Sequence, residues 1–414
     1  MKAMPPARSG PVAVVGVGVK TPAGLTLDSL WSALCAGRST AERVVDERLP
    51  ADARVLASRV QGFDPGAHLS AMEQRRFDRA HQLAIAAAQD AMDSFGPDRP
   101  SHERCAVVCG VGLGAPAFQE AQYARLHASG PASLSPLTIP MMMPSALAAL
   151  LSLRFHFKGP CFTVSTACAS GATAIAEGVE LIRRGAADLV LAGGADSMLT
   201  YSALAGFLRL DVMSRQTDQP ALASRPFDAE RDGFVMGEGA GFVVLQRADD
   251  ARASRRRLFG FIAGHASTSD AHNLVAPSPS GDGALACLRG ALLDAGVTAA
   301  DVGHVNAHGT STVQGDLSEA LALVALFQGD TPPVTAVKGA TGHLIAGSGA
   351  VEAIVTLRSL EAGIVPPIAG LHHVDPKIHV DLVQHAPRKV HRGPVLSNSF
   401  GFGGINTALV LSAA

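Results

Sequence analysis

Three residues of the sequence could together perform nucleophilic chemistry, and the first is a cysteine. Cys168 lies in the stretch VSTACASGATAI (164–175), where an extended segment changes into a predicted helix. At a helix start, backbone N–H groups and the helix dipole favour a thiolate, and the same N–H groups could hold a developing oxyanion. A free cysteine is also commonly a small, inert core residue. Taken alone, Cys168 favours the core interpretation.

Two histidines change this balance. His308 follows an apolar strand in NAHGTST, and His343 lies in KGATGHLIAG with Lys338 five residues before it. A lone histidine is more often a structural residue than a catalyst. Two histidines flanked by glycine, at strand–loop and loop–helix junctions, lie where open α/β sheets place their sites. They support Cys168 as a nucleophile, whereas a zinc site is disfavoured because no two ligands are closely spaced.

A glycine-rich run holds two aromatic side chains. NSFGFGGIN (398–406) places Phe400 and Phe402 between glycines, which implies tight turns and close backbone approach. One interpretation is a hairpin corner with core aromatics. The other is an apolar gate beside a site, with a backbone N–H donor.

A charged stretch, RPFDAERDGFVMGEGAG (225–241), leads into a predicted strand. It overlaps 213–238, the most polar part of the chain, which we expect to be a surface excursion between strands. A solvated loop is the simpler interpretation. Buried charges that pair and brace a site are the alternative.

Composition bounds the class of protein. Of the 414 residues, 47% are hydrophobic and 17% charged, which suits a packed core, and the net charge is −2. So small a net charge gives no overall electrostatic attraction to nucleic acid or to an anionic membrane. No apolar run reaches membrane-span length, and MKAMPPARSG lacks the apolar region of a signal peptide. Six irregularly spaced cysteines then favour free thiols in a reducing cytoplasm.

Apolar strand-like runs alternate with helical patterns, which is typical of an α/β fold with buried strands. The N-terminal half, 1–257, carries the cysteine, and the C-terminal half, 258–414, carries both histidines. In each half a small-residue helix follows a threonine and leads to an apolar strand, a weak internal repeat. Long helical patterns cover 71–94 and 342–363. We expect strands at 11–17, 105–112, 187–194, 239–246, 258–267, 394–404 and 405–412.

Together these motifs resemble those of the β-ketoacyl-acyl carrier protein synthases, the elongating condensing enzymes of the thiolase superfamily, and they are also similar to type II polyketide ketosynthases. The matching stretches follow the family's order: VSTACASGATAI, GGADS, RPFDAERDGFVMGEGAG, NAHGTST, VKGATGHLIAGSGAVEAI and NSFGFGGIN. With the opening PVAVVGVGVKTPAG they cover nearly the whole chain. The resemblance implies a thiolase-like α/β fold of two pseudo-duplicated, layered αβαβα halves, normally assembled as a dimer.

The resemblance also assigns roles to the chemical residues. Cys168 matches the acyl-accepting nucleophile, and His308 and His343 complete a Cys-His-His triad. Lys338 matches the active-site lysine of the family, and Glu352 matches a buried acidic residue near it.

Further positions follow from the same motifs. Phe402 matches the gating phenylalanine, whose amide joins that of Cys168 in an oxyanion hole. Thr310 and Thr312 match threonines that bond the pantetheine arm. Phe400 and Asp316 are expected to support the site.

The implied reaction is a decarboxylative Claisen condensation. An acyl group on the cysteine is joined to malonyl-acyl carrier protein, which gives a 3-ketoacyl-carrier product. The substrates are bound as thioesters to the phosphopantetheine of the carrier, and the resemblance implies no cofactor and no metal. The family's basic docking region for an acidic carrier matches Arg75, Arg76 and Arg79. A solvated helix face is the simpler interpretation, but the expected acidic partner favours docking.

The sequence departs from the family pattern at a few positions. Val275 lies where many fatty-acid synthases carry a threonine, which puts one pantetheine contact in doubt. The run PMMMPS (140–145) lies where the substrate tunnel and the dimer contact usually form, and its methionines could shape the acyl pocket or fill the core. Ser348 stands where alanine is usual.

Alternatives remain open in the biological role. Fatty-acid elongation and a dedicated polyketide or polyene ketosynthase are not separated by the sequence, nor is a homodimer from a heterodimer with a chain-length-factor-like homologue. A non-condensing partner subunit is disfavoured because the cysteine, both histidines and the lysine are present. A coenzyme A thioester thiolase or hydrolase is disfavoured because no cysteine follows Cys287.

Overall fold

The computed structural model describes residues 10–44, 47–49, 55–254 and 256–414. The first nine residues, to which the expectation about a signal peptide applies, lie outside this part. No helix among the described residues is long and apolar enough to cross a membrane.

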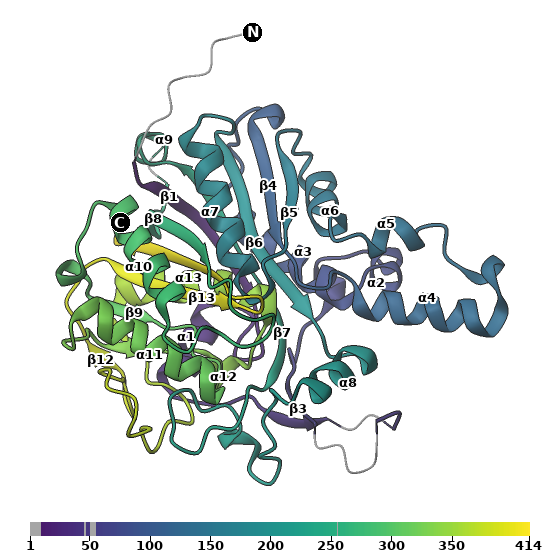
Figure 1. Cartoon of the computed structure of the whole chain (residues 1–414). Coiled ribbons are helices and arrows are strands. Elements are labelled where there is room, and N and C mark those ends of the chain that lie inside the picture. Colours follow the sequence, from purple (N-terminus) through teal and green to yellow (C-terminus); the bar gives the residue numbers. More distant parts are fainter. Residues whose placement is uncertain (1–9, 45–46, 50–54, 255) are drawn as a thin grey trace.

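One large sheet runs through the described part of the chain, and its main path is β10-β9-β13-β14-β8-β1-β7-β6-β4-β5 (Figure 1). The first half supplies β1 (Val12–Lys20), β4 (Cys105–Gly110), β5 (Cys161–Val164), β6 (Leu189–Ser197) and β7 (Met236–Arg247). The second half supplies β8 (Gly260–Ser269), β9 (His304–Asn306), β10 (Val334–Thr335), β13 (Val395–Gly401) and β14 (Ile405–Ser412). Two shorter strands extend this sheet: β3 (Val55–Ser58) pairs with β7, and β2 (Glu42–Val44) pairs with β3. A separate pair consists of β11 (Ile364–Val365) and β12 (Arg388–Lys389).

The two halves repeat one topology. Counted in sequence order along the main path, each half arranges its strands as third, second, fourth, fifth and first. In each half the second strand is parallel to the third and fourth, and the fifth is antiparallel to its neighbours. The halves join where β1 pairs antiparallel with β8, at Val12 opposite Ile262. The predicted pseudo-duplication is therefore confirmed.

Helices complete the layers around the two half-sheets. The longer ones are α1 (Leu27–Cys35), α3 (Arg79–Phe95), α4 (Pro116–Ser129), α6 (Ala146–Phe155), α7 (Ser170–Arg183), α8 (Tyr201–Leu210), α10 (Asp282–Ala295), α11 (Val313–Phe327) and α13 (Ser348–Ala362). The shorter ones are α2 (Ala71–Arg76), α5 (Thr138–Met142), α9 (Ala248–Ala253) and α12 (Lys338–Thr341).

The central layer consists of α7 and α13, which pack against each other and against strands of both halves. Helix α3 covers the outer face of the first half, and α10 and α11 cover the outer face of the second. Small residues let the central helices approach closely: a Cβ on Gly171 of α7 would lie 2.9 Å from the backbone nitrogen of Ala350 in α13. The order of layers is the αβαβα arrangement expected from the sequence.

Each strand that the sequence predicts is found, with ends that differ by up to three residues. Two long helical patterns were misjudged. The pattern over 71–94 forms two helices, because Asp78 leaves the helical conformation and its carboxylate accepts the Ala80 N–H group as an N-cap. The pattern over 342–363 becomes regular helix only at Ser348, because Gly342 and Ile345 adopt left-handed backbone conformations.

The polar stretch 213–238 is not a surface excursion throughout, so that expectation is wrong. Arg231 is buried and pairs with Asp375 at 2.8 Å and with Asp316 at 3.6 Å. Buried charges need such partners, and here they tie the stretch to the second half of the chain.

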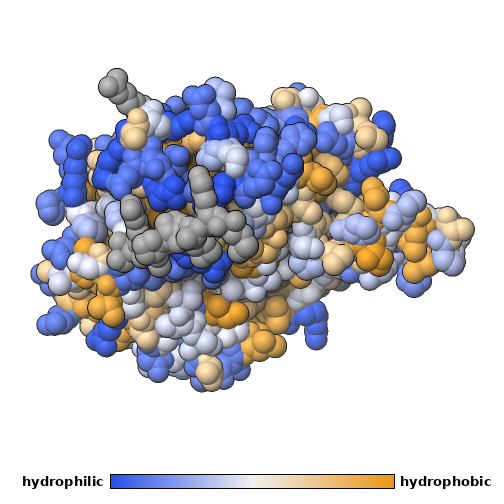
Figure 2. Space-filling model, turned by 90° about the horizontal axis from the view of Figure 1, so that it is seen from above, coloured by the Kyte–Doolittle hydropathy of each residue, from blue (hydrophilic) through white to orange (hydrophobic). Residues whose placement is uncertain are grey.

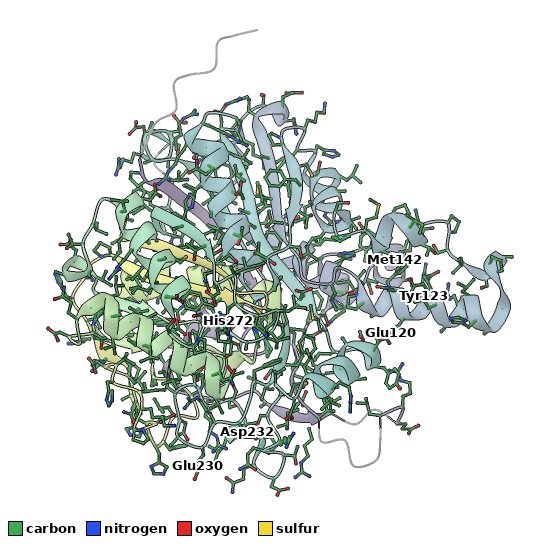
Figure 3. All side chains as sticks on the ribbon, in the orientation of Figure 1. Glu120, Tyr123, Met142, Glu230, Asp232 and His272 are labelled. Atoms are coloured by element: carbon green, nitrogen blue, oxygen red, sulfur yellow. The ribbon has the colours of Figure 1, made fainter. Side chains whose placement is uncertain are left out.

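One segment projects from the body of the molecule. Helices α4 and α5 extend away from both half-sheets (Figure 1), and Figure 2 shows hydrophobic residues on this projecting part. Tyr123 lies on α4 and Met142 on α5, as Figure 3 shows. The neighbouring Ile139 is 68% exposed. The methionine run 140–145 therefore lies partly at the surface instead of wholly in the core.

Candidate active site

Cys168 occupies a short turn between β5 and α7. The turn is a single 3-10 segment, Ala167–Ala169, in which Ala167 adopts a left-handed backbone conformation with φ 50°. The hydroxyl of Ser170 accepts the Thr166 N–H group at 2.9 Å and donates to the Ala167 carbonyl at 2.7 Å. An unusual conformation held by such bonds is typical of functional turns.

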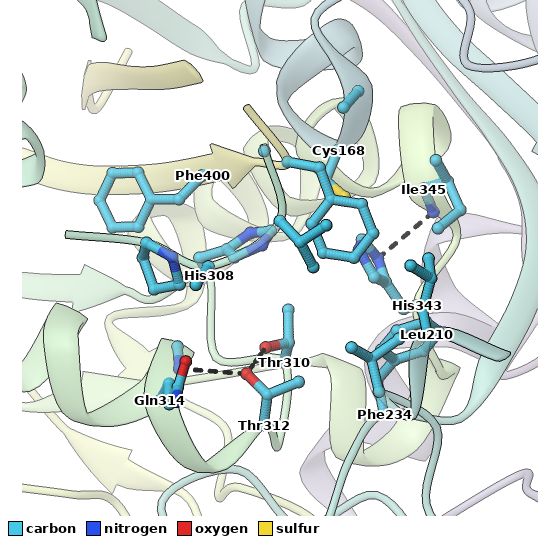
Figure 4. A pocket seen from close by; sticks show the side chains of 18 of the residues that line it. Cys168, Leu210, Phe234, His308, Thr310, Thr312, Gln314, His343, Ile345 and Phe400 are labelled. Carbon is cyan, nitrogen blue, oxygen red and sulfur yellow. Dashed lines mark hydrogen bonds between the residues drawn. The ribbon is translucent and has the colours of Figure 1, made fainter. Parts of the chain in front are cut away.

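A cavity of about 710 Å³ opens onto this cysteine. Its wall brings together Cys168, His308 and His343 from three separate stretches of the sequence, and Figure 4 shows them facing a common space. The rings of His308 and His343 are 5.6 Å apart and nearly perpendicular. Apolar side chains supply most of the remaining wall, including Phe207 and Phe234. The volume suits a small-molecule or acyl-group site.

His308 is held from behind by two different groups. Its backbone N–H donates to the carboxylate of Glu319 at 2.8 Å, and Gly309 N–H donates to the other oxygen at 2.9 Å. Lys338 Nζ donates to the His308 carbonyl at 2.5 Å and lies 3.3 Å from Nδ1 of the ring. Because lysine has no acceptor when charged, Nδ1 must be the acceptor. The ring proton of His308 is therefore on Nε2.

The lysine itself is buried behind the cavity wall. Lys338 forms an ion pair with Glu352, and burial raises the pKa of that carboxyl group while the lysine charge lowers it. Both residues come from the segment that begins with α12 and continues into α13. Glu352 is thus a buried acid next to Lys338, as the resemblance implies.

His343 lies in the irregular segment between α12 and α13. The backbone N–H of Ile345 donates to its Nδ1 at 3.3 Å, so its ring proton is also on Nε2. Phe234 packs edge-on against the ring at 5.4 Å. Within the described residues the Nε2 atom of His343 is buried without a hydrogen-bond partner. A buried donor of this kind needs a partner, and the adjoining cavity offers a place for one.

Burial sets the charge of both imidazoles. Burial lowers the pKa of His308 and of His343 well below the usual 6.5, and the positive charge of Lys338 lowers both further. Both rings are therefore neutral near pH 7. They present two neutral N–H donors to the site.

Burial also decides the state of the thiol, and here the thiolate expectation is wrong. Burial raises the pKa of Cys168 to about 11, although Lys338 and the Phe402 N–H group act to lower it. The sequence suggests a helix start at Cys168, but α7 begins only at Ser170. Desolvation outweighs the nearby charge and N–H groups, so the free protein holds a thiol.

The glycine-rich turn after β13 reaches the cysteine from the opposite side. The Phe402 N–H group is directed at the Cys168 sulfur. Gly401 permits this approach, because a Cβ there would lie 2.6 Å from the Thr166 carbonyl oxygen. The Phe402 ring contacts Phe207 at 6.4 Å, and the Phe400 ring lies 5.9 Å from His308. Both phenylalanines line the cavity.

Thr310, Thr312 and Val275 line the cavity as well. The two threonine hydroxyls are 3.0 Å apart (Figure 4). Asp316 stands behind this loop, where its carboxylate accepts the Ser311 N–H group at 3.0 Å. Burial raises the pKa of Asp316 to about 7, and the charge of Arg231 opposes this. Asp316 thus braces the threonine loop and lies outside the cavity wall.

The three arginines of the expected docking region do not act as one group. Arg75 and Arg76 are exposed at the end of α2. Arg79 begins α3 and turns inward, where it pairs with Glu238 at 3.1 Å and donates to the Val60 carbonyl at 3.0 Å. The break between α2 and α3 separates them.

Sequence reasoning missed Glu319, Asn398 and Phe234. Asn398 donates to the Glu319 carboxylate at 2.9 Å, so β13 and α11 are tied together behind His308. A signal was present, because Glu319 lies three residues after Asp316 on a helix and therefore shares its inward face. No sequence pattern marked Phe234, which lies in the polar stretch 213–238.

Comparison with known proteins agrees with this geometry. The family models for the N-terminal and C-terminal domains of beta-ketoacyl synthase match residues 9–251 and 259–372. The chain is 36% identical to 3-oxoacyl-[acyl-carrier-protein] synthase 2 of Vibrio cholerae, over 96% of this chain and 98% of that protein. It is 38% identical to the enzyme of the same name from Rhizobium meliloti, over 97% and 98% of the two chains.

Solved structures are similar over the same length. A beta-ketoacyl synthase from Burkholderia phymatum has a TM-score of 0.91 at 32% identity, over 98% of this chain and all of that one. The ishigamide ketosynthase/chain length factor has a TM-score of 0.89 at 29% sequence identity. The type II polyketide ketosynthase AntDE, in complex with its acyl-carrier protein AntF, has a TM-score of 0.90 at 26% sequence identity. Both matches cover 98% of this chain and all of the other.

The doubled α/β fold, with a cysteine and two histidines at one cavity, defines an acyltransferase of the condensing class. Within that class, the chain belongs to the beta-ketoacyl synthase family.

Proposed function

We propose that this chain is an elongating β-ketoacyl-acyl carrier protein synthase. The observation that carries the proposal is the placement of Cys168 in one cavity with two neutral imidazoles, each of which carries its proton on Nε2. A thiol can store an acyl group, and two neutral N–H donors can stabilise an enolate without protonating it. Residues 1–257 then supply the nucleophile, and residues 258–414 supply the histidines.

The first half-reaction loads the cysteine. Cys168 attacks the thioester carbonyl of an acyl carrier, and its proton passes to the carrier sulfur, which leaves as a thiol. The N–H groups of Cys168 and Phe402 hold the oxyanion, which collapses to release the carrier thiol and leave an acyl-cysteine. The raised thiol pKa means that deprotonation is part of this step and does not precede substrate binding.

The second half-reaction forms the carbon–carbon bond. The malonyl-carrier thioester takes the place of the first carrier, with its carbonyl oxygen at the Nε2–H groups of His308 and His343. Carbon dioxide leaves, and the resulting enolate carbon attacks the acyl-cysteine carbonyl. The same two backbone N–H groups hold the new oxyanion. Its collapse releases the 3-ketoacyl-carrier product and expels the Cys168 thiolate, which takes up a proton from solvent.

The carrier arm and the carrier itself bind through different residues. We assign Thr310 and Thr312 to the pantetheine arm, since both hydroxyls line the cavity. Arg75 and Arg76 remain the docking candidates, because an acidic carrier needs exposed positive charge. Arg79 is withdrawn from this role since its charge is already paired with Glu238.

The assembly and the compartment belong to the same proposal. We propose a dimer, either with a second copy or with a chain-length-factor-like homologue, and the exposed apolar side chains of the α4–α5 segment support it. Cysteines in the described residues are free thiols, which supports a reducing cytoplasm. Fatty-acid and polyketide elongation both use this cysteine, these two histidines and this condensation chemistry.

The test is the intact mass of the purified protein after incubation with a panel of acyl-carrier thioesters. An adduct of one acyl class that is absent from Cys168→Ala would support the nucleophile and identify the substrate. Formation of a 3-ketoacyl-carrier after malonyl-carrier is added would support condensation. No adduct with any acyl group, alone or with a homologous partner subunit, would contradict the proposal.

A further inference from the structure

The Nδ1 atom of His343 has a second neighbour, the hydroxyl of Ser348. The Ser348 Oγ atom lies 3.1 Å from Nδ1 and also accepts the backbone N–H of Leu344 at 3.0 Å. Ser348 is 2% exposed and is the first residue of α13. The hydroxyl therefore closes the irregular segment that carries the histidine onto the start of the helix.

The direction of this hydrogen bond follows from its neighbours. Ile345 N–H also points at Nδ1, so Nδ1 offers a lone pair and carries no proton. Leu344 N–H already occupies an acceptor position on Oγ. The Ser348 proton is then free to point at Nδ1, and within the described residues Oγ makes no other hydrogen bond. Ser348 donates, and His343 accepts.

The Nδ1 atom of each imidazole thus accepts a hydrogen bond, but the two donors differ in chemical type. His308 receives its Nδ1 bond from the ammonium of Lys338, and His343 receives one from a neutral hydroxyl. Which nitrogen of a histidine carries the proton is set by the bond that the other nitrogen makes. The Ile345 bond is long for an N–H donor, which leaves the hydroxyl as the shorter of the two contacts.

We propose that Ser348 is a positioning residue for His343, an inference that rests on the proposed condensing function. Its hydroxyl holds the ring in the tautomer that presents Nε2–H to the thioester carbonyl of the malonyl substrate. Loss of the hydroxyl leaves Nδ1 with one weak donor, so part of the population moves its proton to Nδ1 and aims a lone pair at the enolate oxygen. Decarboxylation suffers, whereas acyl transfer to Cys168 does not depend on this tautomer.

The test compares Ser348→Ala with the wild-type protein in the two half-reactions. We expect kcat for malonyl-carrier decarboxylation to fall about fivefold to tenfold, the range for loss of one neutral hydrogen bond, with KM unchanged. The rate of acyl transfer to Cys168 should change by less than about twofold. The matched control is Ser359→Ala, another buried serine on α13, whose hydroxyl bonds the Ile364 carbonyl away from the cavity. This control should change neither half-reaction.

A spectroscopic readout is independent of activity. In protein labelled with 15N-histidine, with the His343 signals identified by His343→Gln, the wild type should show a protonated Nε2 and an unprotonated Nδ1. Ser348→Ala should show a mixture of tautomers. A protonated Nδ1 in the wild type would overturn the inference even if the variant did not fold. Equal losses in both half-reactions, or an unchanged variant, would also overturn it. Absence of both half-reactions in the wild type would instead contradict the proposed function.

Discussion

Lys338 and Glu352 form an ion pair in which each side chain is only 1% exposed, directly behind His308 and out of contact with the cavity. The lysine donates to the ring and the carbonyl of His308, and the carboxylate balances its charge. A buried pair of this kind gives little net stability, but removal of one partner leaves an uncompensated charge. The pair therefore supports the orientation of the histidine more than the stability of the fold.

The first prediction separates these two effects. Lys338→Met should lower the free energy of unfolding by about 3–5 kcal/mol, the usual cost of breaking a buried pair. The double variant Lys338→Met/Glu352→Gln should recover most of that loss, because no charge is left unpaired. Decarboxylation should stay at least about a hundredfold below wild type in both, since neither restores the donor to His308 Nδ1. Urea unfolding and a decarboxylation assay measure the two quantities, and recovery of activity in the double variant would contradict this account.

The second prediction concerns the thiol. The pKa of Cys168 is raised to about 11, so the reactive thiolate is a minor form at neutral pH and its share rises with pH. The rate of iodoacetamide alkylation at Cys168 should therefore rise about tenfold for each pH unit between pH 7 and 9. Mass spectrometry of the Cys168 peptide follows this site alone, which matters because Cys161 is exposed. A plateau in the rate below pH 8 would mean that the nearby N–H groups outweigh burial.

The third prediction concerns acid stability. His81 is buried in α3, its Nδ1 has no partner within the described residues, and burial lowers its pKa to about 4. The unfolded chain takes up this proton near pH 6.5, so the stability from His81 is full above that pH and is lost as the pH falls toward 4. Relative to wild type, His81→Leu should gain about 2 kcal/mol of unfolding free energy between pH 7 and pH 5.

Urea unfolding of both proteins at the two pH values measures this gain. The other titrating groups are common to wild type and variant, so they cancel in the difference. The exposed His127 provides the control, and His127→Leu should give a much smaller change. A pH-independent difference for His81→Leu would show that the histidine is charged or paired in the folded protein.

The fourth prediction separates the three arginines of the expected docking region, Arg75, Arg76 and Arg79. Arg75→Glu/Arg76→Glu should raise KM for an acyl-carrier substrate about tenfold at low salt and leave a pantetheine-sized thioester unaffected. Arg79→Ala should instead lower the midpoint of thermal unfolding, because Glu238 loses its partner. Arg289→Glu/Arg392→Glu, a pair of exposed charges elsewhere, serves as the control. An equal rise of KM for both substrates would remove the docking role from Arg75 and Arg76.

The fifth prediction concerns the turn that carries Phe402. In Gly401→Ala the new methyl group would meet the Thr166 carbonyl at 2.6 Å and the Cys168 nitrogen at 3.2 Å, so the turn must move. Loss of one oxyanion donor typically costs about a hundredfold to a thousandfold in rate. We expect acyl transfer to Cys168 to fall by that order, as measured by single-turnover mass spectrometry. Gly206→Ala on α8 tests whether the effect is specific, because an added Cβ there meets no atom within 4 Å.

The sequence predicts the doubled fold and singles out three residues that line one cavity, because both leave local patterns. Buried strands leave apolar runs, and Cys168, His308 and His343 each lie in a short motif of small residues. What it does not predict depends on surroundings from distant segments. Burial beside Phe234 and Ile345 raises the pKa of the Cys168 thiol. Arg79 turns inward because it pairs with Glu238 on β7. Helix periodicity also cannot reveal a break such as Asp78, where a capping residue interrupts an otherwise helical pattern.

The order of the strands has a consequence for biosynthesis. Strand β14 comes last of the strands in the sequence, yet it lies between β13 and β8 near the middle of the sheet. The second half-sheet therefore stays open, and Phe402 has no fixed place, until translation has passed this strand. The turn that carries Cys168 also packs against Ile345 and against β13, so the surroundings of the nucleophile are complete only when the last part of the chain has been made.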